Sequence, residues 1–298
     1  MLDVNAKIDM SEVVRIKDQL IKEGVVSASD FELKQDFDIA SGATHYPIMF
    51  IVDVSGSMHG ERENLNAAIH DFIGDIWNSK TALSSSIDFS IVTFANRVIV
   101  KRPFSYIKAE DFSDDAERNT IKAKDVGGST NMASAMFVAW YLSEVRKGQY
   151  KRADLDYKQP IFVLISDLCN NEERKIDDSY HLVSEVLSMY RSKVDGKRIG
   201  MIKALYGNIS DYYDEKITGI RMDGTVDFSK TLKTLFSDLL STVARMEDKG
   251  KYFKWDAEDD DVFLPDNQSD YQQPGDNSFT SETYEKLKAL FDCDDNEE

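Results

Sequence analysis

The sequence predicts an α/β fold with a doubly wound, mainly parallel central sheet, one antiparallel edge strand and helices on both faces. Two apolar runs, residues 47–52 and 161–165, lack polar alternation, which is typical of parallel strands buried on both faces. Segments with helical periodicity lie between such runs, and this alternation indicates a sheet between two helical layers. At 298 residues with 42% hydrophobic side chains, the chain suits one large domain with extensions.

Residues 1–43 are predicted to form an N-terminal arm. Ser11 begins a short amphipathic helix over residues 12–23, and Gly24 ends it. Because the apolar residues of this helix share one face, we expect it to pack on the flank of the main domain. That domain is predicted to span residues 44–250.

The main domain is predicted to alternate strands and helices. The first strand leads into a helix over residues 60–77, whose apolar residues recur at helical spacing. Residues 87–94 alternate like a half-buried strand and form a hairpin with a short strand over residues 98–100. The later expected elements are a helix over 132–145, a strand over 161–165, a helix over 181–190, a strand over 199–205 and an amphipathic helix over 228–246.

A basic segment before the strand at 161–165 is expected to be a solvated loop. It precedes the amino end of that strand, so it should lie on the side of the sheet opposite the carboxyl ends of the strands. Its basic residues are Arg146, Lys147, Lys151, Arg152 and Lys158.

The net charge of −18 is concentrated near the C-terminus. Residues 256–298 hold 15 Asp or Glu and two Lys, a net charge of −13, which leaves −5 for the rest of the chain. This charge opposes nonspecific binding to nucleic acid or to an anionic membrane, so neither is expected as a partner. We predict a largely disordered acidic tail over residues 251–298, with a candidate helix over 282–291. A tail carboxylate that blocks the chain's own metal site is a hypothesis that deletion of residues 256–298 would test.

Cysteine usage favours a reducing, cytoplasmic setting. Only Cys169 and Cys293 occur, which argues against a disulfide framework. No apolar run approaches the roughly 20 residues that span a bilayer, and the first residues lack the pattern of a secretory signal. We therefore expect a cytoplasmic protein.

Asp53, Ser55 and Ser57 directly follow the first strand and predict a site for a divalent cation. Their side chains alternate, so a tight turn at the strand end can bring them to one point. Carboxylate and hydroxyl oxygens suit Mg²⁺ or Mn²⁺, and Ca²⁺ less well. One carboxylate and two neutral hydroxyls leave such a cation short of negative charge. The pattern therefore favours an external carboxylate as a further ligand.

Two further loops are expected to reach the same cation. Residues 125–132 carry a glycine pair and then the hydroxyls of Ser129 and Thr130 at a helix start. Asp167 ends the second apolar strand much as Asp53 ends the first. Because open α/β sheets bind ligands at the carboxyl ends of their strands, the three loops can meet there.

Residues 53–57, 127–132 and 164–167 together resemble the metal-ion-dependent adhesion site of von Willebrand factor A domains. The resemblance covers roughly residues 44–247 and implies a Rossmann-like α/β fold. It also implies a protein partner that supplies an Asp or Glu carboxylate to complete an octahedral Mg²⁺ shell. The residues that the resemblance assigns to the metal, directly or through water, are Asp53, Ser55, Ser57, Thr130 and Asp167.

Two features depart from the family pattern. Leu168 stands where many relatives have glycine, so the path of the loop after Asp167 is open. Ser129 lies between the glycine pair and Thr130, so either hydroxyl is a candidate ligand, and we favour Thr130. The residues expected to surround the metal and contact the partner are His59, Ser129, Asn131 and Leu168.

A narrower resemblance concerns residues 141–147 and the polar linker before Pro160, which look similar to the bacterial TerY-like group of tellurite-resistance and stress proteins. This resemblance implies a scaffold or adaptor in a stress or phage-defence system with a Ser/Thr kinase and a PP2C-type phosphatase. A subunit that partners an AAA+ ATPase, as in chelatases, is the alternative.

The chain is not expected to be an enzyme, although a metal-dependent hydrolase stays an alternative. Ser55 lies in a strand-turn-helix segment, but the Gly-x-Ser-x-Gly motif of hydrolases is absent. Residues 127–130 lack the lysine of a P-loop. A phosphotransferase with an aspartyl nucleophile would need a second carboxylate where Ser55 stands.

Overall fold

The strands form one mixed sheet, which confirms the predicted fold class. The structure is a computed structural model and describes residues 10–34, 44–78, 86–112, 117–128, 130–166, 201–206, 218–221 and 228–249. Within these residues the six-stranded sheet has the order β3-β2-β1-β4-β5-β6, and only the β2–β3 pair at one edge is antiparallel. The strands are β1 (Tyr46–Asp53), β2 (Ile87–Phe94), β3 (Val98–Ser105), β4 (Ile161–Ile165), β5 (Met201–Tyr206) and β6 (Thr218–Arg221).

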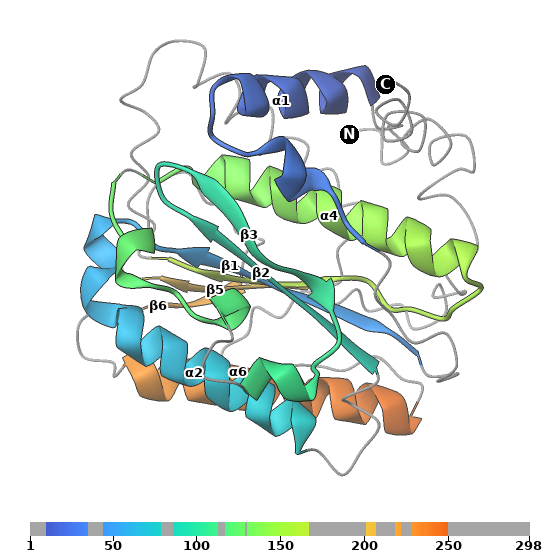
Figure 1. Ribbon diagram of the computed structural model, residues 1–298. Coiled ribbons are helices and arrows are strands. Elements are labelled where there is room, and N and C mark those ends of the chain that lie inside the picture. The colour runs from blue at the N-terminus through green and yellow to red at the C-terminus, as the bar shows by residue number, and fades with distance from the viewer. Residues whose placement is uncertain are drawn as a thin grey trace.

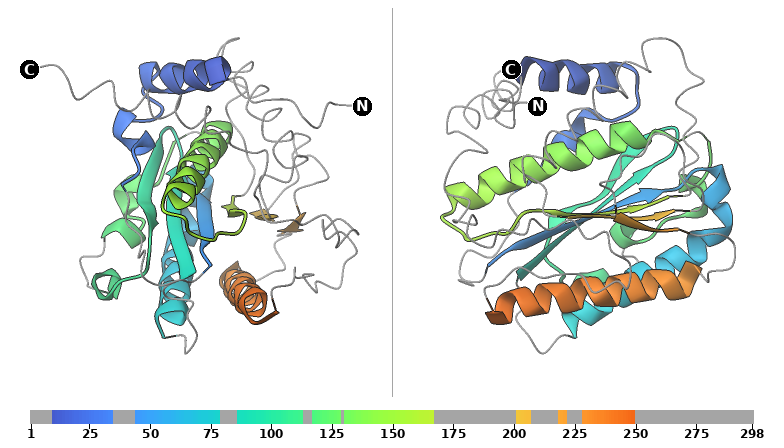
Figure 2. Two further views of the ribbon diagram at one scale, coloured as in Figure 1. Left: turned by 90° about the vertical axis from the view of Figure 1, so that its right-hand side faces the viewer. Right: turned by 180° about the vertical axis from the view of Figure 1, so that it is seen from behind.

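Helices cover both faces of the sheet (Figure 1). α2 (Arg62–Trp77) and α6 (Phe228–Lys249) lie on one face, and α4 (Met132–Arg152) lies on the other. α1 (Met10–Lys22) forms a further layer outside α4, as the side and rear views also show (Figure 2). Short 3-10 helices connect these elements: η1 (Ala28–Phe31), η3 (Gly56–Glu61), η4 (Ala109–Phe112), η5 (Glu117–Asn119) and η6 (Ala123–Asp125).

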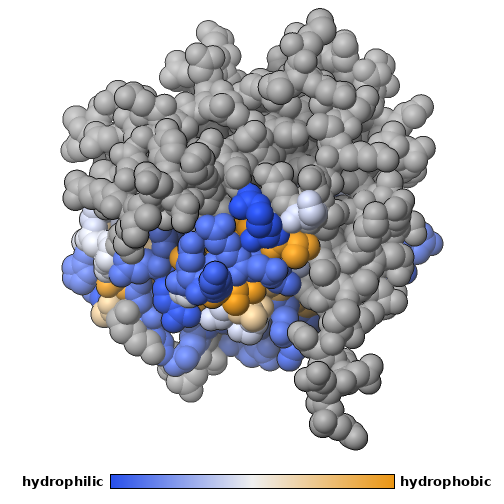
Figure 3. Space-filling view, turned by 90° about the horizontal axis from the view of Figure 1, so that it is seen from above, coloured by the Kyte–Doolittle hydropathy of each residue, from blue (hydrophilic) through white to orange (hydrophobic). Residues whose placement is uncertain are grey.

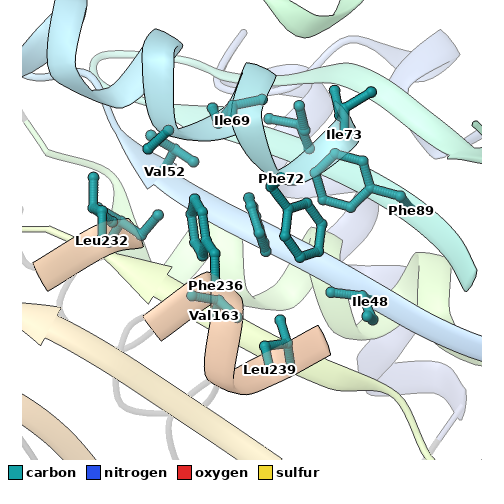
Figure 4. Close-up of a cluster of buried hydrophobic side chains, with 14 of the residues drawn as sticks. Ile48, Val52, Ile69, Phe72, Ile73, Phe89, Val163, Leu232, Phe236 and Leu239 are labelled. Carbon is teal, nitrogen blue, oxygen red and sulfur yellow. The ribbon is translucent and has the colours of Figure 1, made fainter. Parts of the chain in front are cut away.

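The central strand β1 is buried along its whole length, as its continuous apolar sequence predicts. Met49 and Ile51 belong to the core on the α4 side, whereas Phe50 belongs to the core under α2 and α6. There the ring of Phe50 stacks on Phe236 at 4.5 Å and meets Phe89 edge-on at 4.7 Å. Figure 4 shows Phe89 and Phe236 in this core. Both faces of β1 thus bury apolar surface, which holds its carboxyl end firmly in the middle of the sheet.

α4 is longer and more deeply buried than predicted. It continues to Arg152 instead of ending at residue 145, and 18 of its 21 residues are buried. One side of α4 faces the sheet, and on the other side Val13, Ile16 and Leu20 of α1 join the same core. α1 therefore packs on the flank of the domain as expected, and the described surface seen from its side is mostly hydrophilic (Figure 3).

The prediction of a solvated basic loop after residue 145 is wrong for Arg146 and Lys147, both of which are buried in α4. Lys147 forms an ion pair with Glu144 at 2.6 Å. Arg146 forms a buried ion pair with Asp88 of β2, and Tyr150 donates a hydrogen bond to the same carboxylate. The sequence does not reveal this burial, because the partners of the two positive charges lie one turn away on the helix or on another element.

The last described residues of the N-terminal arm, Leu33 and Lys34, are hydrogen-bonded to α4. Arg146 Nη1 donates to the carbonyl of Lys34 at 3.5 Å, and Gln149 Nε2 donates to the carbonyl of Leu33 at 2.8 Å. Burial and the neighbouring carboxylate of Asp88 raise the pKa of Tyr150 well above its usual value, so its hydroxyl stays a donor. The end of the arm thus docks on a polar cluster at the amino end of the sheet.

Other boundaries differ from the predictions. β3 extends to Ser105 because Arg102, in its middle, is buried by partners from outside the strand. β6 was not predicted, α2 begins two residues later than expected, and η3 precedes it. The helix predicted at 181–190 and the acidic tail over 251–298 lie outside the described residues.

Arg102 ties β3 to the segment that leads toward α4. Its guanidinium pairs with both carboxylate oxygens of Asp111, at 2.5 and 3.3 Å, and donates to Asn119 Oδ1 at 2.9 Å. It also donates to the carbonyls of Phe89 and Tyr106. Every one of these contacts is buried, so the cluster holds the η4–η5 segment against the sheet.

Acidification is expected to destabilise the protein through Asp111. Burial alone raises the pKa of Asp111, but the hydrogen bonds and charge of Arg102 outweigh burial and lower it to about 2, from 3.8. Because the folded-state pKa is the lower one, this stabilisation is complete above about pH 5 and is lost as the pH falls from about 4 to 2. The loss amounts to about 2 kcal/mol of unfolding free energy. Urea unfolding across this range checks it, and Asp111→Asn should remove that part of the pH dependence.

None of the helices in the described residues is both long and apolar enough to cross a membrane.

Candidate metal centre

The candidate metal centre lies where the strand order changes direction. β1 has β2 on one side and β4 on the other, and the chain proceeds from β1 to β2 before it returns to β4. The paired residues Val52 and Ile165 bring the carboxyl ends of β1 and β4 together. In open α/β sheets this switch point is the usual place for a ligand.

Asp53 is the last residue of β1 and is completely buried. Its Oδ1 accepts a hydrogen bond from the backbone N–H of Ser55 at 2.8 Å, and its Oδ2 accepts one from Ser166 Oγ at 2.5 Å. These two bonds stabilise the carboxylate and fix its orientation. The carboxylate is therefore held in place by one bond from its own loop and one from the residue after β4.

Ser55 and Ser57 bring two hydroxyls to the same loop. Ser55 is buried, whereas Ser57 is exposed in η3. Their Oγ atoms lie 3.1 Å apart, within hydrogen-bonding distance. The structure thus brings together Asp53, Ser55 and Ser57, as the alternating sequence predicts.

The loop before α4 reaches the end of β1. The N–H of Gly127 donates to the carbonyl of Val54 at 2.8 Å. Gly128 has a φ of +90°, and a side chain there would meet Asn96 at 2.2 Å, so this close approach requires glycine. Two residues later, Thr130 is 1% exposed, and its Oγ1 has no hydrogen-bond partner among the described residues. A buried hydroxyl without a partner is unfavourable, which indicates a ligand as its partner.

The remaining predicted residues divide into two groups. His59 is exposed in η3 beside the serine loop. Asn131 is only partly buried, and its Nδ2 donates to the carbonyl of Asn96 at 2.6 Å, so this side chain holds a neighbouring turn. Ser129, Asp167 and Leu168 lie outside the described residues.

The donor set fits a hard divalent cation. Its candidate donors are all oxygen atoms, the ligands that such cations prefer. They are one fixed carboxylate (Asp53), two neighbouring hydroxyls (Ser55 and Ser57) and a buried hydroxyl with no partner among the described residues (Thr130). Within the described residues no group of three or more His, Cys, Asp and Glu side chains is placed to hold a metal.

Two further residues belong to this region. Ser166 lies in the predicted 164–167 motif but is not among its predicted ligands, and Asn96 is not predicted from the sequence. Ser166 follows β4 immediately, beside Asp53 in the neighbouring strand, and the parallel pairing of the two apolar runs was the available signal. Asn96 lies in the turn between β2 and β3, and its carbonyl interacts with a residue 35 positions away. Only the tertiary structure shows this contact.

Residues 48–167 match the family model described as the von Willebrand factor type A domain. A search for similar curated proteins found no match. The matched residues run from β1 to the residue after Ser166 and so contain all the loops described above.

Several solved structures are similar to this one at low sequence identity. The pilus adhesin SpaC from Lactobacillus rhamnosus GG is 11% identical over 69% of this chain and 30% of its own, with a TM-score of 0.48. Proximal thread matrix protein 1 from the mussel byssus is 18% identical over 67% of this chain and 48% of its own, with a TM-score of 0.42. The PilB minor pilin from Streptococcus sanguinis is 13% identical over 70% of this chain and 64% of its own, with a TM-score of 0.45.

The chain thus spans less than two thirds of the length of each of these three proteins. The sheet order, the helices on both faces and the family match over residues 48–167 agree with one another. Residues 48–167 are thus similar to von Willebrand factor type A domains, and the α/β fold of the described residues fits that similarity.

Proposed function

We propose that this protein is a metal-dependent binding module that engages a carboxylate of a partner protein. The observation that carries the proposal is the buried Thr130 hydroxyl, which has no partner among the described residues and belongs to a loop bonded to the end of β1. The fixed carboxylate of Asp53 and the hydroxyls of Ser55 and Ser57 supply further oxygen ligands on that strand end. Von Willebrand factor type A domains often mediate interactions between proteins, which supports the same function.

The ligand set explains why the partner group should be a carboxylate. A bound Mg²⁺ or Mn²⁺ would act as an electrophile with an open coordination position. Hydroxyls carry no charge, so Asp53 and Asp167 are the only anionic ligands in the proposed set. An Asp or Glu carboxylate from the partner adds the missing negative charge. We include Ser129 as the alternative hydroxyl ligand.

The proposed partner surface surrounds this loop. His59 is exposed beside the loop, and we propose that it contacts the partner. Ser129 and Leu168 remain proposed contacts, whereas the amide of Asn131 is engaged with the turn at Asn96, so we propose only a supporting role for it. The module performs no catalysis in this proposal.

The biological setting is proposed from the narrower resemblance to TerY-like proteins. In this setting the chain is a cytoplasmic scaffold of a stress or phage-defence system, and its partners are a Ser/Thr kinase and a PP2C-type phosphatase. The low cysteine content agrees with a reducing compartment. An AAA+ ATPase as the main partner is the alternative.

Partner capture is expected to require both the metal and Asp53. The full chain should retain its partners in Mg²⁺ and lose them in EDTA, because chelation removes the ion that bridges the two carboxylates. Asp53→Asn should lose them in either buffer. Asp75→Asn, which removes the same charge from an exposed position on α2, should behave like the unmodified chain.

The identity of the captured proteins separates the alternatives. Recovery of a kinase and a phosphatase supports the proposed setting, whereas recovery of a ring-forming ATPase supports the alternative. Equal recovery in Mg²⁺ and EDTA would contradict a metal-bridged contact. Metal-dependent turnover of a phosphoester or ester that Asp53→Asn abolishes would show a hydrolase instead.

A further inference from the structure

We propose that the N-terminal arm sets the metal affinity of the site by holding the turn between β2 and β3, which in turn positions Thr130. This inference rests on the proposed function, because it assigns positioning residues to the same metal centre. The structure describes residues 10–34 of the arm, and the turn consists of residues 95–97. None of these residues is a proposed metal ligand.

The arm bonds to the outer edge of β3 next to the turn. The N–H of Val98 donates to the carbonyl of Val25 at 2.8 Å, and the N–H of Val100 donates to Asp30 Oδ1 at 3.3 Å. Arg97, in the turn itself, donates to Ser27 Oγ at 3.1 Å. β3 is an edge strand, so the arm supplies hydrogen-bond partners that the sheet does not.

The same turn bonds on its other side to the loop of Thr130. The N–H of Asn131 donates to the carbonyl of Ala95 at 3.0 Å, and Asn131 Nδ2 donates to the carbonyl of Asn96 at 2.6 Å. Gly128 packs so closely on the Asn96 side chain that an added methyl group would overlap it. Thr130 lies between Gly128 and Asn131, so both of its flanks are held by this turn.

These contacts form a continuous chain from the arm to the proposed ligand. The arm is also fixed at its far end, through the Leu33 carbonyl and Gln149, and its apolar face is buried against α4. It therefore acts as a brace and not as a loose segment. If docking of the arm favours the bound position of Thr130, binding of the metal must favour docking of the arm to the same extent.

The test compares metal affinity in full-length variants that loosen the arm near the turn. Asp30→Ala removes the acceptors for the N–H groups of Val100 and Ser27. Titration calorimetry with MgCl₂ and MnCl₂ should show about fivefold or more weaker binding, the lower end of typical coupling between sites. In the unmodified chain, saturating Mg²⁺ should also slow hydrogen exchange at the Val98 and Val100 amides.

A control separates this effect from charge. Asp18→Ala removes the same charge from an exposed position of α1 and should bind the metals like the unmodified chain. Gln149→Ala loosens the far end of the arm, away from the turn, and should weaken binding less than Asp30→Ala does. Equal weakening by Asp18→Ala would overturn the role of the turn, as would unchanged affinity in Asp30→Ala.

The outcome for the unmodified chain separates the two proposals. If it binds metal and Asp30→Ala binds it equally well, the coupling is wrong and the proposed function stands. If the unmodified chain binds neither Mg²⁺ nor Mn²⁺, both proposals fail.

Discussion

Replacing Thr130 with valine is expected to stabilise the metal-free protein by about 1 kcal/mol and to weaken binding of Mg²⁺ or Mn²⁺ about tenfold or more. Valine has nearly the shape of threonine but no hydroxyl, and the Thr130 hydroxyl is buried with no partner among the described residues. Removing it therefore relieves the cost of an unsatisfied polar group, which is about 1–3 kcal/mol. The same change deletes a proposed metal ligand. Urea unfolding in EDTA and metal titration measure the two effects.

This experiment is informative because stability should rise while metal affinity falls. A purely structural hydroxyl would lower stability when removed and leave metal binding unchanged. Thr93→Val serves as the matched control, because Thr93 is equally buried in β2 and its Oγ1 bonds to the carbonyl of Ile99 at 3.5 Å. It should not alter metal affinity. A Thr130→Val protein that binds metal normally would remove Thr130 from the ligand set and leave Ser129 as the candidate.

Replacing Arg146 with alanine is expected to lower the free energy of unfolding by about 3–5 kcal/mol. The change leaves the carboxylate of Asp88 buried without its cationic partner, and a broken buried ion pair is strongly destabilising. It also removes the bonds from Arg146 to Gln149 Oε1 and to the carbonyl of Lys34. Chemical denaturation followed by circular dichroism measures the loss.

A second change on the partner side identifies the cause. The Arg146→Ala and Asp88→Ala double variant should be more stable than the sum of the single changes predicts, because no charge is then left unpaired. Arg152→Ala, at an exposed position of the same helix, should change stability by less than about 0.5 kcal/mol. If Arg146→Ala is equally mild, the basic segment behaves as the solvated loop that its composition indicates.

The central strands β1 and β4 were predictable because a strand buried on both faces requires an unbroken run of apolar residues. β1 and β4 are unbroken apolar runs, and their pairing follows once a parallel sheet is inferred. α4 was harder, since a helix buried on nearly all sides has no polar face to mark its extent. Charged residues such as Arg146 also suggest solvent unless a partner on a distant strand is known.

The candidate metal centre was likewise predictable only in part. Asp53, Ser55 and Ser57 are neighbours in the chain, so their convergence could be inferred from spacing alone. Ser166 and the turn at Asn96 could not, because each contacts the site across more than 30 residues of sequence. Asp167 stays a prediction, since it lies outside the described residues.

The sequence by itself determined the fold class, the candidate oxygen ligands and the strand ends expected to carry them. These properties are local, since they depend on residue type and on spacing within one strand or one turn. The tertiary structure decided that the N-terminal arm bonds to the edge strand β3 and that Arg146 and Lys147 of α4 are buried. Such contacts depend on which segments meet in space. A charge or a backbone amide that pairs with a distant residue produces no periodic pattern in the sequence, so the sequence alone does not predict it.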